Sequence, residues 1–348
     1  MRNGKRSEPP SSVLLFVWGG IGNMVMALPM LSAIRKRRPD DEVAVVVEKG
    51  VMAELLVPGR YAAVVALDDP LFQELPGKIR LIKKLRSLKP ATFLSSVPWP
   101  IVRYKILARL SGAKKALTLP GGKRALRNNY HRDHRSNIEN NLMTLGQLGI
   151  GGGQRIPELP SNLPDMAFAG TFLRESGIER GRGIVGLHPG AGDPKKRFSE
   201  NIFIELGRNL VARGCGAVVA GGREEQPLKQ RVAREIGKGA ISTPPHLRLG
   251  QTLGLIDSCK LFISNDSGLA HCSAALGVPT IALFGPTDHR ISGPAGRLVG
   301  IITSRTGCRP CYYPGKRPGC SAKDQPCLRL TFDEFRQQLD ENLRVFFA

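Results

Sequence analysis

Residues 260–286 read KLFISNDSGLAHCSAALGVPTIALFGP, and this stretch decides the fold class. Its apolar run at 261–264 predicts a buried strand, the polar residues 265–268 a turn, and the spacing over 269–276 a short helix before a second strand at 280–284. Strand, turn and helix in this order predict an α/β unit with parallel strands. Ligands of such sheets bind beyond the carboxyl ends of the strands, so the Asn-Asp-Ser-Gly turn is placed to hold a phosphate on its N–H groups. The alternative is that these polar side chains only cap the helix.

Strands and helices alternate along the rest of the chain. Further apolar runs that predict buried strands lie at 13–18, 43–47, 62–67, 91–95, 183–187 and 216–220. A Gly- and Pro-rich stretch without periodicity at 151–164 predicts a linker. We therefore predict two doubly wound, Rossmann-like α/β domains that face each other across a cleft, the first over 12–150 and the second over 165–330. Residues 1–11 are predicted to be a disordered tail, and residues 331–348 a C-terminal helix.

The composition is that of a globular protein. The chain has 348 residues, of which 41% are hydrophobic, and no apolar run approaches the ~20 residues that cross a bilayer. The basic start and the short apolar run after it read as a tail and a first strand rather than a signal peptide. Seven cysteines in such a chain indicate a reducing compartment instead of a disulfide framework. We predict a cytoplasmic protein.

Positive charge is concentrated in one stretch, residues 76–132, which we call the basic stripe. The formal net charge of the chain is +22, and the basic stripe holds fifteen Lys or Arg residues and no Asp or Glu. Such a stripe favours an anionic partner, namely nucleic acid, an acidic membrane surface, or a phosphorylated lipid or glycan, and the alternative is a solvated face. Few aromatic residues accompany it, which disfavours base stacking. The poorly patterned residues 120–136 predict a mobile loop.

The first predicted strand ends in a glycine turn. Residues 19–23 read GGIGN and are followed by a helical pattern, so the backbone can approach a ligand closely there. The turn is only loosely similar to the dinucleotide fingerprint, because the final glycine of that motif is absent.

Four blocks together resemble glycosyltransferase family 9, the ADP-heptose:lipopolysaccharide heptosyltransferases. They are HPGAGDPKKRFSE at 188–200, GGREEQ at 221–226, NDSGLAHCSAALGVPTIALFGPTD at 265–288, and GGIGNMVMALP at 19–29. The family has the GT-B fold, so the resemblance implies that the C-terminal domain binds a nucleotide sugar and the N-terminal domain the acceptor. It also implies inverting transfer that needs no catalytic metal.

The resemblance assigns roles to the donor-site residues. It implies that a glycine turn approaches the diphosphate, that Lys196 neutralises charge on the leaving phosphate, and that Asp266 contacts the sugar. Either Glu224 or Glu225 is expected to meet the ribose hydroxyls. The donor-binding residues implied are Gly190, Ala191, Gly192, Lys196, Arg197, Glu224, Glu225, Asp266, Ser267 and Gly268. We interpret His271, which lies on the predicted helix, as a core histidine.

The acceptor side departs from the family at Asn23. Family members commonly have Asp there, proposed as the general base, whereas an amide cannot accept a proton at neutral pH. Three alternatives stay open: Asn23 only orients the acceptor, the protein binds without catalysing, or another group is the base. Candidates for that base are Asp68, Asp69, His131 and His134. The acceptor-binding residues expected are Gly20, Gly22, Asn23, Lys83, Lys84 and Arg86, and the catalytic residues expected are Asn23, Lys196 and Asp266.

Four cysteines, Cys308, Cys311, Cys320 and Cys327, lie within the segment 308–327. One Cys-x2-Cys pair and two further cysteines among Gly and Pro predict a closed structural site for Zn or Fe, with free thiols or artefactual disulfides as the alternative. The segment also resembles that of some family 9 members, including autotransporter heptosyltransferases, which hold iron there. The remaining cysteines read as small core residues: Cys215, Cys259 and Cys272.

We therefore predict an inverting glycosyltransferase that moves a heptose or similar sugar, with ADP-heptose as the expected donor, to a lipopolysaccharide core or other anionic glycan. The acceptor would be reached by peripheral contact with the cytoplasmic face of the inner membrane. One alternative is a non-catalytic protein that binds a nucleotide sugar, because of Asn23. The other is a nucleic-acid-binding protein that uses the basic stripe.

Overall fold

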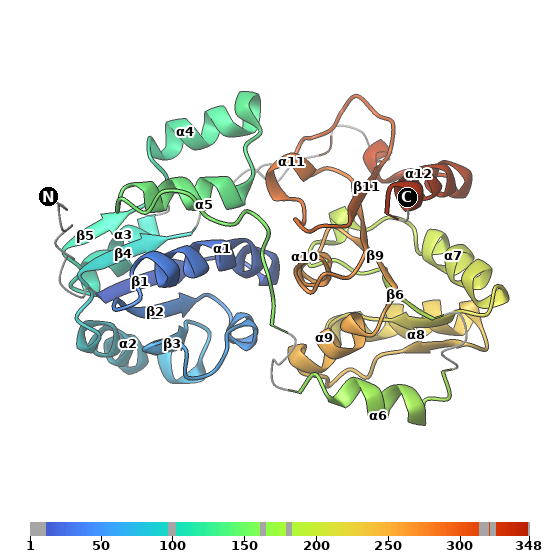
Figure 1. The fold of residues 1–348 in the computed structure, drawn as a ribbon, viewed down its shortest axis with the longest axis horizontal. Helices are drawn as coiled ribbons and strands as arrows, with labels where there is room; N and C mark the ends of the chain where they lie inside the picture. The colour runs from blue at the N-terminus through green and yellow to red at the C-terminus, as the bar shows by residue number, and fades with distance from the viewer. Residues whose placement is uncertain are drawn as a thin grey trace, which may run out of the picture. The chain divides into compact units, whose positions relative to one another are not determined.

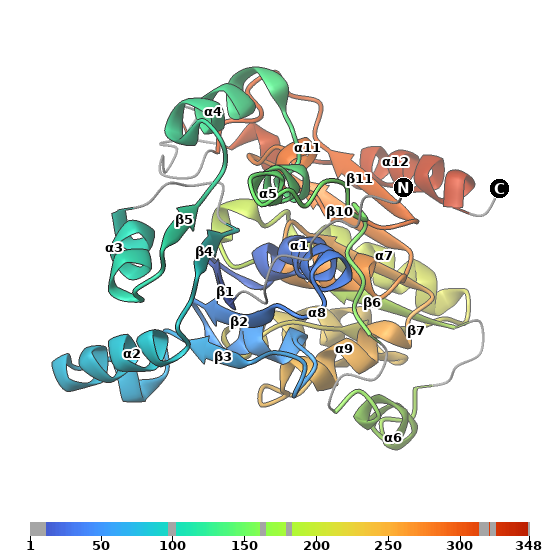
Figure 2. The same cartoon turned by 60° about the vertical axis from the view of Figure 1, so that its left-hand side comes forward.

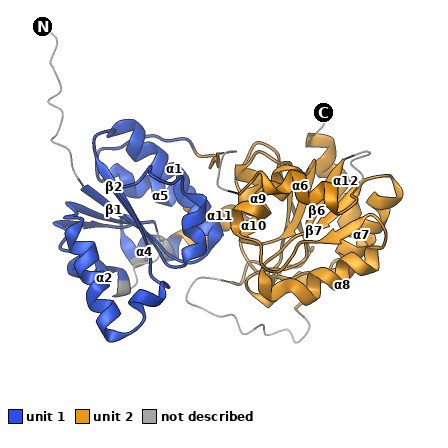
Figure 3. Cartoon of the chain, turned by 90° about the horizontal axis from the view of Figure 1, so that it is seen from below, with its two compact units in different colours: residues 1–128, 138–154 blue, residues 129–137, 155–348 orange. Residues whose placement is uncertain are grey.

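The structure is a computed structural model that describes residues 12–96, 102–160, 165–178, 183–312, 320 and 325–346. The chain divides into two compact units (Figures 1 and 3). Unit 1 comprises residues 1–128 and 138–154, and unit 2 comprises residues 129–137 and 155–348. The predicted tail lies outside the described residues, and the domain limits given above stay predictions. Nothing in the sequence pattern indicated that residues 129–137 belong with unit 2.

Unit 1 is built on a five-stranded parallel sheet with the strand order β3-β2-β1-β4-β5. Its strands are β1 Ser12–Val17, β2 Glu42–Val47, β3 Ala63–Ala66, β4 Thr92–Ser95 and β5 Lys115–Leu117. Val13 pairs with Val43 on one side and with Thr92 on the other. The sheet core includes buried Phe16 and Phe93. The sequence analysis missed β5, because this three-residue edge strand is only partly buried and so lacks an apolar run.

The helices of unit 1 connect its parallel strands or follow the last of them. They are α1 Ile21–Arg37, η1 Gly50–Leu55, η2 Pro70–Phe72, α2 Leu75–Ser87, α3 Val102–Leu110, α4 Gly122–Asn128 and α5 Asn137–Gly146. Helices α2 and α3 pack together beside the sheet (Figures 1 and 2). The prediction of a mobile loop at 120–136 is wrong, because α4 and the π-helical turn η3 (Asn129–Asp133) occupy most of these residues.

Unit 2 is built on a six-stranded parallel sheet with the order β11-β10-β9-β6-β7-β8. The strands are β6 Ile184–His188, β7 Gly216–Val219, β8 Ala240–Ser242, β9 Leu261–Asn265, β10 Thr280–Phe284 and β11 Val299–Thr303. The chain builds outward from β6 through β7 to β8 and then crosses to β9. The strand order therefore reverses between β6 and β9, which is where doubly wound sheets bind ligands.

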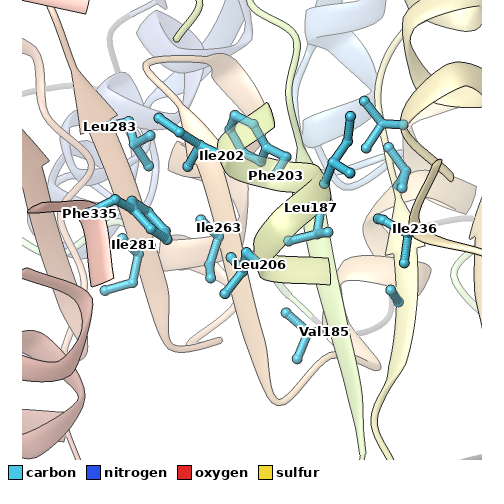
Figure 4. Packing of buried hydrophobic residues seen from close by; sticks show 14 of the residues in the cluster. Val185, Leu187, Ile202, Phe203, Leu206, Ile236, Ile263, Ile281, Leu283 and Phe335 are labelled. Atoms are coloured by element: carbon cyan, nitrogen blue, oxygen red, sulfur yellow. The ribbon is translucent and has the colours of Figure 1, made fainter. Parts of the chain in front are cut away.

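Helices pack against this sheet and bury its core (Figure 4). They are α6 Phe168–Glu175, η4 Pro194–Lys196, α7 Glu200–Ala212, η5 Arg223–Glu225, α8 Gln226–Ile236, α9 Leu249–Asp257, α10 Gly268–Ala275, α11 His289–Ser292, η6 Pro326–Leu328 and α12 Phe332–Phe346. Leu187, Ile263 and Leu283 from neighbouring strands meet Phe203 of α7 and Phe335 of α12 in one apolar cluster. Within the described parts of the chain, no helix combines the length and apolar character needed to cross a bilayer.

Candidate functional site

The loops after β6 and β9 meet at the reversal point of the unit 2 sheet (Figure 1). The side chain of Asn265, fully buried, joins them: its amide donates to the carbonyl of Pro189 at 2.7 Å, and its carbonyl oxygen accepts from the N–H of Phe198 at 3.2 Å. Asn265 is therefore a structural residue rather than a helix cap. Capping is done by Ser267, whose hydroxyl accepts from the N–H of Ala270.

The structure brings Lys196 and Asp266 together, as the sequence analysis had grouped them. The Nζ atom of Lys196 lies 2.8 Å from Oδ2 of Asp266, and the hydroxyl of Thr287 donates to the same oxygen at 2.6 Å. Asp266 is buried, whereas the Lys196 side chain stays 22% exposed and lies 5.5 Å from the centre of the Tyr312 ring. A partly exposed cation is thus held at the end of β9, where a phosphate could reach it.

Glu225 is engaged inside the protein. Its Oε2 atom lies 3.0 Å from Nε2 of His188 and accepts from the N–H of Gly222 at 2.9 Å, while Oε1 lies 3.5 Å from Arg197. Burial raises the pKa of this carboxyl, but the hydrogen bond and charge of His188, with Gly222 and Arg197, lower the pKa to about 2. Gly190 is packed so tightly here that a Cβ on it would lie 1.9 Å from Oε1. Glu225 therefore supports the loop after β6, residues 189–193, which we call the phosphate loop after the role expected of it.

His188 was not singled out in the sequence analysis, although it opens the first block. Its Nδ1 atom lies 2.9 Å from the hydroxyl of Ser267 and 3.1 Å from that of Ser264. The imidazole therefore links the ends of β6 and β9 to Glu225. The sequence feature that could have identified His188 is its position at the end of a predicted strand, directly before Pro-Gly.

We expect Glu225→Gln to lower the free energy of unfolding at neutral pH by an amount that shrinks as the pH falls. Because the folded-state pKa of Glu225 lies below its ordinary value of 4.5, the carboxylate stabilises the fold above pH 4.5, and this contribution is lost as the pH falls toward 2. A lowering from 4.5 to about 2 corresponds to about 3 kcal/mol at neutral pH. Urea unfolding of wild type and variant at pH 7, 4 and 3 checks this. A stability difference that does not shrink at low pH would contradict it.

Lys229 is a second residue that the sequence analysis missed. Its side chain, on α8, is fully buried, and its Nζ donates to the carbonyls of Gly221 and Thr243 at 3.0 Å and to the Thr243 hydroxyl at 3.1 Å. Burial lowers the pKa of Lys229 to about 8, opposed by the charge of Glu225. Lys229 therefore ties the turn before Glu225 to the end of β8.

Glu224 and His271 lie in different surroundings. Glu224 is exposed, so of the two carboxylates in its block it is the accessible one. His271 is buried, in agreement with its interpretation as a core histidine. Burial lowers the pKa of His271 to about 4. The charge of Asp266 raises this pKa and the charge of Lys196 lowers it further, and the imidazole is neutral at physiological pH.

In unit 1 the glycine turn holds Asn23. The amide of Asn23 donates to the carbonyl of Trp18 at 3.0 Å, and Gly19, with φ at +90°, packs against that amide. A carboxylate that the sequence analysis did not consider lies here too, because Oε2 of Glu48 accepts from the N–H of Gly19 at 2.7 Å. Gly20 caps α1 without a side-chain hydrogen bond.

The candidate bases are placed very differently. Asp68 accepts from the N–H of Gly50 at 2.7 Å and Asp69 caps η2, so both have structural roles. His131 is exposed, and His134 contacts Asp288 in unit 2. Among the residues expected to bind the acceptor, Lys83 and Lys84 are exposed on α2, whereas Arg86 donates to the carbonyl of Leu110 at 3.0 Å.

The four cysteines of segment 308–327 are free thiols. Burial raises the pKa of Cys311, and the pKa of Cys327 to about 11, and charges on the other thiols of the segment add to both effects. Within the described residues, however, no three His, Cys, Asp or Glu side chains are gathered as metal ligands. The predicted site is therefore not formed by the described geometry.

Comparison with known proteins gives a consistent result. A family model for glycosyltransferase family 9 (heptosyltransferase) matches residues 106–320. Lipooligosaccharide heptosyltransferase 2 of Haemophilus influenzae is 29% identical over 136 residues, which are 38% of this chain and 39% of that protein. The chain thus spans about two fifths of the length of that relative.

Two solved structures share the fold. The structure of Escherichia coli ADP-heptose lps heptosyltransferase II is 18% identical, with a TM-score of 0.72 over 97% of this chain and 100% of the other. The dodecameric iron-containing heptosyltransferase TibC from enterotoxigenic E. coli, in complex with ADP-D-beta-D-heptose, is 12% identical, with a TM-score of 0.62 over 99% and 81%. At these identities the likeness establishes the fold alone, and it is the GT-B fold that was predicted.

Proposed function

This chain belongs to glycosyltransferase family 9, the heptosyltransferase family, and from that premise we propose that it is an inverting glycosyltransferase. The donor proposed is ADP-heptose, and the acceptor a lipopolysaccharide core or another anionic glycan. The observation that carries the proposal is the Lys196–Asp266 pair at the reversal point of the unit 2 sheet. Family and fold lend no support to the nucleic-acid alternative.

The proposed donor site uses the two loops that Asn265 joins. Lys196 would leave Asp266 for the diphosphate, and the N–H groups of Ser267 and Gly268, at the start of α10, would add to the positive potential. Asp266, freed from Lys196, would accept hydrogen bonds from sugar hydroxyls. Glu224 is the better candidate for the ribose, because Glu225 already has donors inside the protein.

The chemical step would place negative charge on the leaving phosphate. Asp266 and the Tyr312 ring hold Lys196 at the end of β9 before the donor binds, and the exchange of Asp266 for the phosphate would bring the cation to the charge that develops. Arg197 donates from two nitrogens to the carbonyl of Ala191, at 3.1 and 2.7 Å, so its proposed contribution is to hold the phosphate loop.

Calorimetric titration with ADP, GDP, UDP and dTDP tests the proposal. We expect selective binding of ADP that is lost in Lys196→Ala and Asp266→Ala. Binding of ADP together with sugar transfer from ADP-heptose would exclude the non-catalytic alternative. If none of the four nucleotides binds, the proposed donor site is wrong.

Peripheral contact with an anionic membrane is a second part of the proposal, and η2 and α2 support it. The side chains of Leu71, Leu75 and Ile79 are spaced four residues apart and are 60%, 72% and 49% exposed. Lys78 and Lys83 are exposed on the same helix, whose buried face is on its other side. Exposed apolar residues among cations suit the interface of a bilayer with anionic lipids. This face of a cytoplasmic enzyme would bring it to a lipid-linked acceptor.

We expect the triple variant Leu71→Ser, Leu75→Ser, Ile79→Ser to bind vesicles with anionic lipid at least tenfold more weakly, since each side chain would lose about 1 kcal/mol of apolar burial. Flotation with vesicles containing 30% phosphatidylglycerol measures this. Val345→Ser, at a position that is 77% exposed on α12, is the matched control and should bind like wild type. Equal binding by the triple variant would refute the contact.

A structural Zn or Fe ion at the four cysteines is the remaining part of the proposal. It is supported by the cysteine spacing and by the mutual influence of the thiols on their pKa values. TibC is described as iron-containing. The described geometry does not gather three ligands, so metal analysis of the purified protein, with Cys308→Ser and Cys311→Ser as controls, decides the matter.

A further inference from the structure

The loop that carries His134 is held in one conformation. The N–H of His134 donates to the carbonyl of Asn129 at 2.8 Å and closes the π-helical turn η3. The buried side-chain amide of Asn129 also binds the backbone of Arg135. Its oxygen accepts from the N–H of Arg135 at 2.7 Å, and its nitrogen donates to the carbonyl of Arg135 at 2.8 Å. His134 itself has a backbone φ of +47°, a conformation that residues other than glycine adopt only rarely. Such a residue persists where its surroundings determine it, and this occurs most often at functional sites.

Asp288 holds the imidazole of His134. The Nδ1 atom lies 2.8 Å from Oδ2 of Asp288, whose side chain is 3% exposed. Arg290 donates to both oxygens of that carboxylate, at 2.9 and 2.8 Å. Burial raises the pKa of Asp288, but the hydrogen bonds from Arg290 and His134 bring it below its ordinary value, so the carboxylate is ionised at neutral pH.

An ionised Asp288 determines which nitrogen of His134 carries the proton. A carboxylate only accepts, so a neutral His134 donates from Nδ1 and leaves Nε2 as an acceptor. A nitrogen of Arg290 also lies 3.0 Å from Nδ1, but an unprotonated Nδ1 would place its lone pair 2.8 Å from the Asp288 oxygen, which also only accepts, so the proton is favoured on Nδ1. The His134 side chain is 25% exposed, so a substrate can reach it. The ionisable groups that act on Asp288 are His134, Tyr130, His289, Arg290 and Arg309.

The pair adjoins the donor site within unit 2. Asp288 directly follows Thr287, whose hydroxyl donates to Oδ2 of Asp266, the oxygen that Lys196 contacts. Sugar transfer requires that the acceptor hydroxyl lose a proton. Asp266 is assigned above to the hydroxyls of the donor sugar, and the amide of Asn23 cannot accept a proton.

We propose that His134, oriented by Asp288, is the general base of the transfer, an inference that rests on the function proposed above. The hydroxyl oxygen of a saccharide acceptor forms a bond to the anomeric carbon of the donor sugar as its proton passes to Nε2 of His134. The bond from that carbon to the phosphate oxygen breaks, and the nucleoside diphosphate leaves with the electron pair beside Lys196. Asp288 stabilises the imidazolium that forms, as a carboxylate does in a Ser-His-Asp triad.

The test is turnover of His134→Asn, since Asn tolerates a positive φ and should preserve the loop. We expect a fall of about 10²–10⁴ in kcat with ADP affinity unchanged within about threefold. In wild type, kcat/KM should fall at acid pH through a single ionisation, and this fall should be absent from the variant. Imidazole added to His134→Gly should restore part of the rate, which a purely structural role would not allow.

One control variant and three refuting outcomes keep the proposal open to refutation. His246→Asn, at an exposed histidine of unit 2, should behave like wild type. A His134→Asn variant that keeps its rate within threefold, or a Glu48→Gln variant that alone removes the acid dependence, would overturn the assignment of the base while leaving the transferase intact. A wild type that binds ADP yet neither transfers nor hydrolyses the sugar of ADP-heptose would overturn both proposals.

Discussion

Lys196→Ala is expected to lower kcat/KM for sugar transfer by about 10²–10³-fold, comparable to the loss of one group that stabilises developing charge. The Lys196 ammonium is the partly exposed cation that Asp266 and the Tyr312 ring hold at the end of β9. Without it, the charge on the leaving phosphate loses its proposed side-chain counter-charge, and the backbone N–H groups remain. The buried Asp266 carboxylate also loses its counter-ion, which repels the diphosphate further.

Steady-state kinetics with ADP-heptose, together with calorimetry of ADP binding, measures this effect. Lys195→Ala is the matched control, because it removes the same charge from the neighbouring, exposed side chain. We expect that control to stay within about threefold of wild type. Equal losses in the two variants would mean that only the general positive potential of the loop matters, and would contradict a specific role for Lys196.

Gly190→Ala is expected to abolish measurable ADP binding and to destabilise unit 2 by about 2–4 kcal/mol. The new Cβ would lie 1.9 Å from Oε1 of Glu225, so the carboxylate must move. That movement breaks its contacts with His188 and the N–H of Gly222, so the carboxylate loses its two shortest hydrogen bonds. The phosphate loop loses its support at the same time.

Gly192→Ala provides the control within the same turn. No atom lies within 4 Å of a Cβ built on Gly192, and this residue lacks a positive φ, so alanine should be tolerated. Thermal unfolding of both variants separates crowding against Glu225 from a general need of the fold for glycine. Equal behaviour of the two variants would show that the contact with Glu225 is unimportant.

Much of the fold and of the donor side could be predicted from local patterns. Buried parallel strands are continuous apolar runs, so residues 261–264 and 280–284 predicted β9 and β10, and the turn after β9 was placed at the ligand-binding edge. The proximity of Lys196 and Asp266 could be predicted because both belong to blocks that follow strands of one sheet. Local pattern failed at residues 120–136, because the side chain of Asn129 satisfies a backbone turn that no periodicity reveals.

The way in which distant polar groups combine depends on how the whole chain packs. His134 lies 154 residues from Asp288, and their contact requires that residues 129–137 pack with unit 2 rather than with their neighbours in the chain. His188 and Glu225 likewise meet because two loops converge at one edge of the sheet. Strands, turns and the kind of chemistry available can be predicted without the structure, since they depend on short-range spacing of residues. The partners of each ionisable group depend on packing between distant segments. They settle which carboxylate supports the loop after β6, and they are the observations on which the proposal for His134 rests.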